Sequence, residues 1–259
     1  MKIIVCVKAV PSSTEVRFDP VSHTIIRDGK QAVINPFDAA ALECALRIGE
    51  SAGAHVTTLS MGIPDTVRIL RDTVARGADE AVLLSDRAFA GSDTLATSYA
   101  LACAVRKTGI PDLLICGKMA VDGDTAQIGP ELAAALGIPA VTNVKEILSV
   151  REDRIRVIRE SDDGEQKVSV SLPALITVVK SIADPRMPSI AGIRAAEAAA
   201  VSVWTAEEIG ADPERTGLAG SATQVVRTFS PERKKECVYI EGSAVEQADR
   251  LRALVEELS

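Results

Sequence analysis

Short, continuous apolar runs recur along the first two thirds of the chain, and each run is followed by a polar loop. Their length and their lack of alternation are typical of strands buried on both faces of a parallel sheet. These runs lie at residues 2–7, 55–61, 78–85, 113–117 and 173–179. The segments 36–48, 66–76 and 94–107 between them repeat apolar residues at helical spacing. The pattern predicts an α/β fold with a mostly parallel, doubly wound sheet.

The pattern changes after residues 140–142, which are predicted as a short strand. Period-2 segments at 145–150, 154–160 and 166–172 predict an antiparallel edge meander, with Asp-Gly at 163–164 as a hairpin turn. Weak alternation at 16–26 predicts a further small hairpin.

The sequence pattern changes again after residue 183. Residues 184–189 form a proline-punctuated loop, 190–200 are predicted as a short Ala-rich helix, and 204–223 are polar, Gly-rich and without a clear period. Residues 241–258 have an amphipathic helical pattern. We expect an α/β core at 1–183 and an extended C-terminal arm at 184–259 that embraces another subunit, with a floppy or crossing linker as the alternative.

Composition and charge narrow the function. Hydrophobic residues make up 47% of the chain and aromatic residues only 3%, so the core is aliphatic. A net charge of −7 without a basic stripe argues against nucleic acid as a partner. We expect no membrane insertion, no secretion signal and a cytoplasmic location. Five scattered cysteines and two histidines predict neither disulfides nor a metal site.

The most informative stretch is 113–131, a buried strand followed by a Gly-containing loop and a helix start. This arrangement presents backbone N–H groups to a phosphate in doubly wound proteins. Thr125 and Gln127 add side-chain donors. Asp122 and Asp124 repel phosphate and fit better as loop-shaping groups or as acceptors for ribose hydroxyls. An ordinary polar loop remains the alternative.

Further candidates lie at neighbouring strand ends. Lys8 follows the first strand and faces either a phosphate or solvent. Asn35 is predicted as the N-cap of the next helix, with a ligand contact as the alternative. Arg87 and Phe89 occupy a loop at the same sheet edge. An arginine beside an aromatic ring can clamp a flavin or an adenine, and the alternative is a surface arginine with a packed Phe. Asp93 or Ser92 is expected to cap the helix that follows.

Several catalytic signatures are missing. The chain has no GxGxxG, no GxxxxGK[ST], no nucleophile elbow and no HExxH. We therefore expect a nucleotide binder without catalytic residues of its own. A flavin suits such a protein, because the cofactor supplies the chemistry.

The chain resembles the small (β) subunit of electron-transfer flavoproteins over nearly its whole length. The resemblance rests on motifs in the family's order: Val7-Lys8-Ala9-Val10-Pro11, Asn35-Pro36-Phe37-Asp38, Arg76-Gly77-Ala78-Asp79, Gly117 to Pro130, Pro173 to Lys180, and Asp184 to Ile190. It implies an α/β core and a C-terminal arm wrapped round an α subunit, which carries the electron-shuttling FAD. In housekeeping members the β subunit holds a structural AMP, and in bifurcating members it holds a second FAD. The segments 85–97 and 122–130 resemble the bifurcating kind.

The resemblance also implies roles for particular residues. Adenosine would meet Cys6, Asn35 and Met61, and the flavin ring would extend toward Arg87 and Thr94. The phosphates would meet the loop Val121, Asp122, Gly123, Asp124, Thr125, Ala126, Gln127 and Ile128. A partner-docking loop would comprise Pro185, Arg186, Met187, Pro188, Ser189 and Ile190, with Ile190 as its apolar tip. The segment 194–200 lacks the lysine cluster that housekeeping members carry.

Three functions follow. In the first, NADH reduces a β-bound FAD, and the electrons part between the α-subunit FAD, which serves an acyl-CoA-dehydrogenase-like partner, and ferredoxin or flavodoxin. In the second, the β ligand is AMP and the chain is a scaffold. The third is a stand-alone adenine-nucleotide-binding regulatory module, which would have no need of the arm.

Overall fold

The computed structural model describes residues 1–12, 32–226, 237 and 239–257, which group into two units. The first unit is Met1–Val225 and the second is Val226–Ser259. The second unit contains α6 (Ala244–Glu257), which confirms the helix predicted at 241–258. The hairpin predicted at 16–26 lies outside the described residues. Within the described ranges, no helix is long and apolar enough to cross a membrane.

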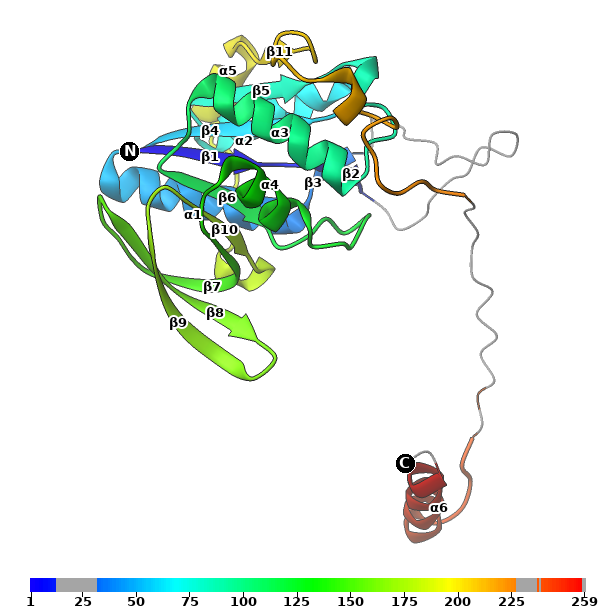
Figure 1. Cartoon of the computed structure of the whole chain (residues 1–259). Helices are drawn as coiled ribbons and strands as arrows, with labels where there is room; N and C mark the ends of the chain where they lie inside the picture. The colour runs from blue at the N-terminus through cyan, green and yellow to red at the C-terminus, as the bar shows by residue number, and fades with distance from the viewer. Residues whose placement is uncertain (13–31, 227–236, 238, 258–259) are drawn as a thin grey trace. The chain divides into compact units, whose positions relative to one another are not determined.

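The described residues contain one nine-stranded sheet, in the order β11-β5-β4-β1-β6-β10-β7-β8-β9 (Figure 1). Neighbours from β11 to β7 are parallel, whereas β7-β8 and β8-β9 are antiparallel. The predicted mostly parallel sheet with an antiparallel edge is therefore confirmed. The strands are β1 (Lys2–Cys6), β4 (His55–Met61), β5 (Glu80–Leu84), β6 (Leu113–Gly117), β7 (Ala140–Val150), β8 (Arg154–Ser161), β9 (Gly164–Ser171), β10 (Ala174–Val178) and β11 (Ser202–Trp204), with β2 (Ala9–Pro11) and β3 (Ala32–Ile34) as a separate antiparallel pair.

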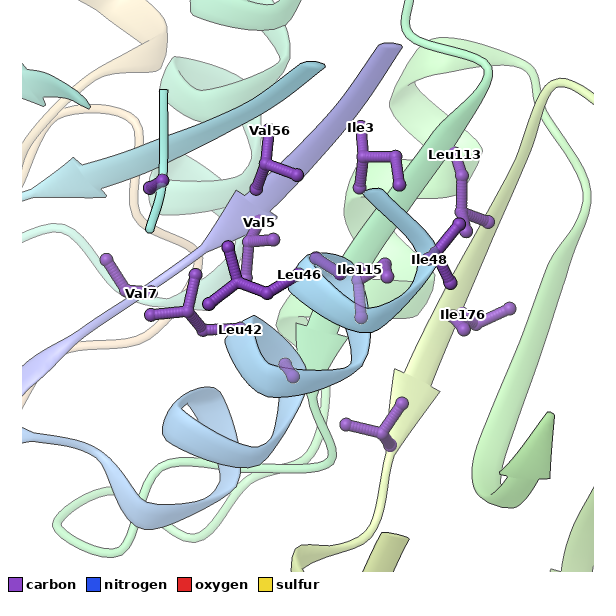
Figure 2. Close-up of a cluster of buried hydrophobic side chains, with 14 of the residues drawn as sticks. Ile3, Val5, Val7, Leu42, Leu46, Ile48, Val56, Leu113, Ile115 and Ile176 are labelled. Atoms are coloured by element: carbon purple, nitrogen blue, oxygen red, sulfur yellow. The ribbon is translucent and has the colours of Figure 1, made fainter. Parts of the chain in front are cut away.

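Helices cover both faces of the sheet, because successive strand residues point to opposite faces and both sets are apolar. Figure 2 shows one face, where Leu42 of α1 packs with Val5 of β1 and Ile115 of β6. On the other face, Leu101 of α3 and Leu132 of α4 belong to a second buried cluster. The helices of the first unit are α1 (Pro36–Ala52), α2 (Val67–Arg76), α3 (Thr94–Thr108), α4 (Ile128–Leu136) and α5 (Ile190–Ala198).

The direction of winding reverses at β1. From β1 the chain proceeds to β4 and β5 on one side, and then crosses to β6 on the other. Val5 is aligned with Thr58 of β4 and with Ile115 of β6, so the carboxyl ends of these strands share one edge. Ligands of open α/β sheets bind at such a switch point. The topology therefore indicates a site beyond the ends of β1 and β6.

The start of the meander differs from the prediction. Residues 140–142 are not a separate strand, because β7 continues without interruption to Val150. Its first residues pair with β10, and the remainder pairs with β8, with a register shift between Val144 and Glu146. Such an irregularity bends a strand, which lets one strand belong to both the parallel and the antiparallel part.

The sequence predicts that the segment 184–225 belongs to the arm, whereas the structure includes it in the first unit. Strand β11 adds to the sheet beside β5, and the Ser85 N–H donates to the Trp204 carbonyl at 3.0 Å. After β11, Ala206 and Ile209 are buried although the segment has no periodic pattern. Its order comes from hydrogen bonds to other loops, which leave no period in a sequence.

Candidate functional site

A cavity of about 860 Å³ lies beyond the carboxyl ends of β1, β4, β5 and β6. Its volume is in the range of sites that enclose most of a ligand, about 300–1,000 Å³. The predicted residues that line it are Cys6, Asn35, Met61, Arg87, Thr94, Gly123, Thr125, Ala126, Gln127 and Ile128. Val121, Asp122 and Asp124 belong to the same predicted set but do not line the cavity.

Asn35 is fully buried directly before α1, but its side chain does not cap that helix, so the predicted capping role is wrong. Its Nδ2 donates to the Met119 carbonyl at 2.8 Å, and its Oδ1 accepts from the Val121 N–H at 3.2 Å. These partly buried peptide groups need partners, and that requirement outweighs the capping preference. Asn35 therefore tethers the loop after β6 to the start of α1.

Asp38 lies one helical turn further on and fixes the floor of the cavity. Its carboxylate accepts from the Lys8 N–H at 2.8 Å and from the Gly117 N–H at 3.1 Å, so it joins the ends of β1 and β6. Burial raises the pKa of Asp38 from 3.8 to about 7, although these hydrogen bonds and the Asn35 amide act in the opposite direction. A Cβ at Gly117 would collide with Asp38, so this approach requires glycine.

The loop before α4 presents unpaired backbone donors. The N–H groups of Thr125, Ala126 and Gln127 make no hydrogen bond to any described part of the protein. Asp124 and Ala126 have positive φ angles of 52° and 55°, whereas Gln127 is right-handed with φ −100°. Alternating backbone handedness turns successive N–H groups to one side and creates a concavity for an anion. The adjoining N-terminus of α4 adds positive potential.

Side chains of the same loop are held from two directions. Lys8 pairs with Asp122 at 2.6 Å, so the Asp122 carboxylate, which does not line the cavity, is neutralised. The Thr94 hydroxyl lies 3.3 Å from Gln127 Oε1 and 3.1 Å from Glu131 Oε1. These contacts connect the start of α3 to the start of α4.

Arg87 lies in a 3-10 turn, Arg87–Phe89, on the cavity wall. The Asp86 carboxylate starts the turn by accepting from the Ala88 N–H at 3.0 Å, and this hydrogen bond leads those that lower the pKa of Asp86. The Arg87 side chain is exposed and forms no ion pair with the described residues, while Phe89 is buried. The structure therefore brings the predicted cation and aromatic side chain to the same wall.

The predicted docking loop, 185–190, contributes nothing to the cavity lining. Arg186 holds its base, since Nε donates to Glu43 at 2.8 Å and a second nitrogen contacts Glu50. Burial opposes ionisation of Glu43, but hydrogen bonds from Arg186 and Arg47 keep its pKa below the ordinary value. Met187 and Ile190 are 83% and 75% exposed. The loop is anchored at Arg186 and presents apolar side chains to solvent.

Sequence reasoning missed two groups at the cavity. Asp38 was treated only as part of a motif, because an acidic residue in a first helical turn is usually explained by the helix dipole. Lys118 follows β6 directly and lines the cavity. Its place at a strand end is the same signal that singled out Lys8. Of the five cysteines, four are buried and Cys237 is exposed.

Comparison with known proteins gives consistent matches. The electron transfer flavoprotein domain model matches residues 22–209. The caffeyl-CoA reductase-Etf complex subunit CarD of Acetobacterium woodii is 45% identical over 95% of this chain and 94% of its own length. The electron transfer flavoprotein subunit beta of Clostridium acetobutylicum is 44% identical over 96% of this chain and 95% of its own. Protein FixA of Azorhizobium caulinodans is 44% identical over 98% and 93%.

The domain match covers more than half of the chain, and the relatives align along nearly all of it. The resemblance to the electron-transfer flavoprotein β subunits is thereby confirmed. The chain belongs to the electron transfer flavoproteins, among their β subunits.

Proposed function

We propose that this chain pairs with an electron transfer flavoprotein α subunit and binds FAD in the cavity beyond β1 and β6. The observation that carries the proposal is the extent of this cavity, about 860 Å³. Its lining includes Cys6, Asn35 and Met61 at the strand ends, the free N–H groups before α4, and Arg87. A mononucleotide would use the strand ends and the free N–H groups, whereas a dinucleotide would also use the wall around Arg87.

The chemistry of the lining fits such a ligand. A pyrophosphate matches the free N–H groups of Thr125, Ala126 and Gln127, because an anion there gains several donors at once. Asn35 holds the preceding turn in place through Met119 and Val121. Lys118, which also lines the cavity, adds positive charge near the phosphates.

A bound flavin can accept a hydride from NADH and release the two electrons one at a time. The protein's own part is position and charge. Arg87 has no ion-pair partner among the described residues, so its charge is available to a ring that gains negative charge on reduction. Phe89, buried in the same turn, gives this wall an apolar backing.

We propose that electrons leave by two routes, through the α-subunit FAD to an acyl-CoA-dehydrogenase-like partner and to ferredoxin or flavodoxin. The exposed Met187 and Ile190, on a loop anchored by Arg186, supply a surface on which such a partner can dock. The names of two relatives support a role in a complex: one is a subunit of a caffeyl-CoA reductase-Etf complex, and another is an electron transfer flavoprotein subunit beta.

The cofactor content of the purified αβ complex tests the proposal. We expect two flavins per αβ pair, measured from the absorbance of the released cofactor against protein concentration. One flavin together with one AMP would instead support the structural-AMP function. A complex with one flavin and no second nucleotide would contradict both.

A further inference from the structure

The segment 205–223, here called the strap, runs alongside the cavity wall formed by residues 86–94. The strap follows β11 and leads to the end of the first unit at Val225. Every residue of the wall except Ala88 lines the cavity, and no strap residue does so. Any effect of the strap on a ligand must therefore act through the wall.

Asp86 joins the strap to the N-terminal end of the wall. Its carboxylate accepts from the Ala88 N–H of the wall and from the Ala206 N–H of the strap, both at 3.0 Å. One carboxylate therefore fixes the 3-10 turn that carries Arg87 and the beginning of the strap together.

The other end of the wall is joined more extensively. The Ser221 hydroxyl accepts from the Asp93 N–H at 2.8 Å and lies 2.7 Å from the Gly217 carbonyl oxygen, to which it donates. The Asp93 carboxylate accepts from the Ala96 N–H at 3.1 Å, which caps α3, and from the N–H and hydroxyl of Thr223 at 2.8 and 3.0 Å. Burial opposes ionisation of Asp93, but these hydrogen bonds hold its pKa below the ordinary value.

Between these ends the strap lies close against the wall and α3. Gly217 has a φ of 57°, its N–H donates to Ser92 Oγ at 3.1 Å, and a Cβ on it would collide with the Ala88 carbonyl. The Arg215 guanidinium lies 4.0 Å from the centre of the Tyr99 ring, whose hydroxyl accepts from the Asp212 N–H at 3.0 Å. The strap is thus fixed to the surface behind the cavity.

We propose that the strap holds the 86–94 wall in its nucleotide-binding position, and that Asp93, Ser221 and Thr223 are positioning residues for the nucleotide. The proposal rests on the proposed function of the cavity. None of the strap residues contacts the cavity, so their influence on affinity is indirect. By linkage, a nucleotide that stabilises the wall must also stabilise the strap.

Substitutions at Thr223 test the proposal in the full-length chain, with FAD and AMP titrated separately by calorimetry. Thr223→Val removes one hydrogen bond to Asp93, and Thr223→Ser retains it. We expect Thr223→Val to weaken FAD binding about threefold to tenfold, as the loss of one hydrogen bond predicts, and Thr223→Ser to restore it. Ser221→Ala should weaken binding further. Thr205→Val is the matched control, because the Thr205 hydroxyl contacts only Glu208 within the strap.

A second measurement separates positioning from general stability. FAD should slow hydrogen exchange at the N–H groups of Gly217 and Thr223 in the wild type, although neither residue lines the cavity. Equal FAD affinity in Thr223→Val and the wild type, with unchanged exchange in the strap, would overturn this inference alone. A wild-type chain that binds neither FAD nor AMP would overturn the proposed function and this inference with it. If Ser221→Ala fails to fold, the comparison of Thr223→Val with Thr223→Ser decides the result, because Thr223 is exposed.

Discussion

Replacing Asn35 by serine distinguishes two roles that a residue before a helix can have. Asparagine and serine cap helices about equally well, so a capping residue tolerates the exchange. In this structure the Asn35 side chain instead spans from the start of α1 to Met119 and Val121. Serine is too short to reach both peptide groups. We therefore expect Asn35→Ser to be nearly as damaging as Asn35→Ala.

The size of the effect follows from the contacts. Asn35 makes one hydrogen bond to each of the two peptide groups, at 2.8 and 3.2 Å. At about 0.5–1.5 kcal/mol for each bond, their loss should lower the free energy of unfolding by about 1–3 kcal/mol. Asn35→Asp should be worse than serine, because a second carboxylate would adjoin buried Asp38 and face the Met119 carbonyl oxygen.

Urea unfolding of the full-length variants measures these differences. The control is Ser189→Asn, since the Ser189 hydroxyl is a true cap that accepts from the Gly192 N–H at 2.9 Å. We expect that exchange to change the free energy of unfolding by no more than about 0.5 kcal/mol. If Asn35→Ser proves as mild as Ser189→Asn, the tethering role is refuted and Asn35 is an ordinary cap.

Three further predictions concern the cavity. Gly123→Val should leave stability nearly unchanged, because a Cβ there meets only Lys8 Nζ, at 3.9 Å. It should block FAD and AMP binding, because the added side chain prevents the close approach of the phosphates to the backbone; retained binding in calorimetry would remove Gly123 from the site. Arg87→Ala should lower the reduction potential of a flavin in the cavity, with Arg87→Lys intermediate; unchanged potentials in redox titrations of the αβ complex would contradict this. Burial raises the pKa of Asp38 from 3.8 to about 7, so the folded protein binds the Asp38 proton more tightly than the unfolded chain does. The stability that this proton contributes is lost as the pH rises from about 3.8 to about 7. The unfolding free energy of Asp38→Asn minus that of the wild type should therefore rise with pH by at most about 1.4 kcal/mol per unit and then level off; a flat difference in urea titrations would refute it.

The parallel sheet could be predicted because burial on both faces leaves a visible record. The run 113–117 is apolar without interruption, and all five residues of β6 are buried. The strap left no such record. Its order depends on a few hydrogen bonds between distant residues: the Asp93 N–H donates to Ser221, and Thr223 donates to the Asp93 carboxylate, across more than a hundred residues of chain. Neither propensity nor periodicity reports a contact of that kind.

The loop at 121–128 has both kinds of feature, one that the sequence predicts and one that it does not. Its strand-loop-helix order predicted free N–H groups, and the structure has them at Thr125, Ala126 and Gln127. The sequence could not predict that Asp124 and Ala126, rather than a glycine, adopt the left-handed backbone. Non-glycine residues in this region cost about 1 kcal/mol or more, and surrounding contacts must hold them there. Here Asp124 donates its N–H to the Ala120 carbonyl at 2.8 Å, and Asn35 secures the same turn from the other side. The strain is therefore sustained by tertiary contacts of the turn, so a substitution at Asn35 should weaken nucleotide binding even though Thr125 to Gln127 are unchanged.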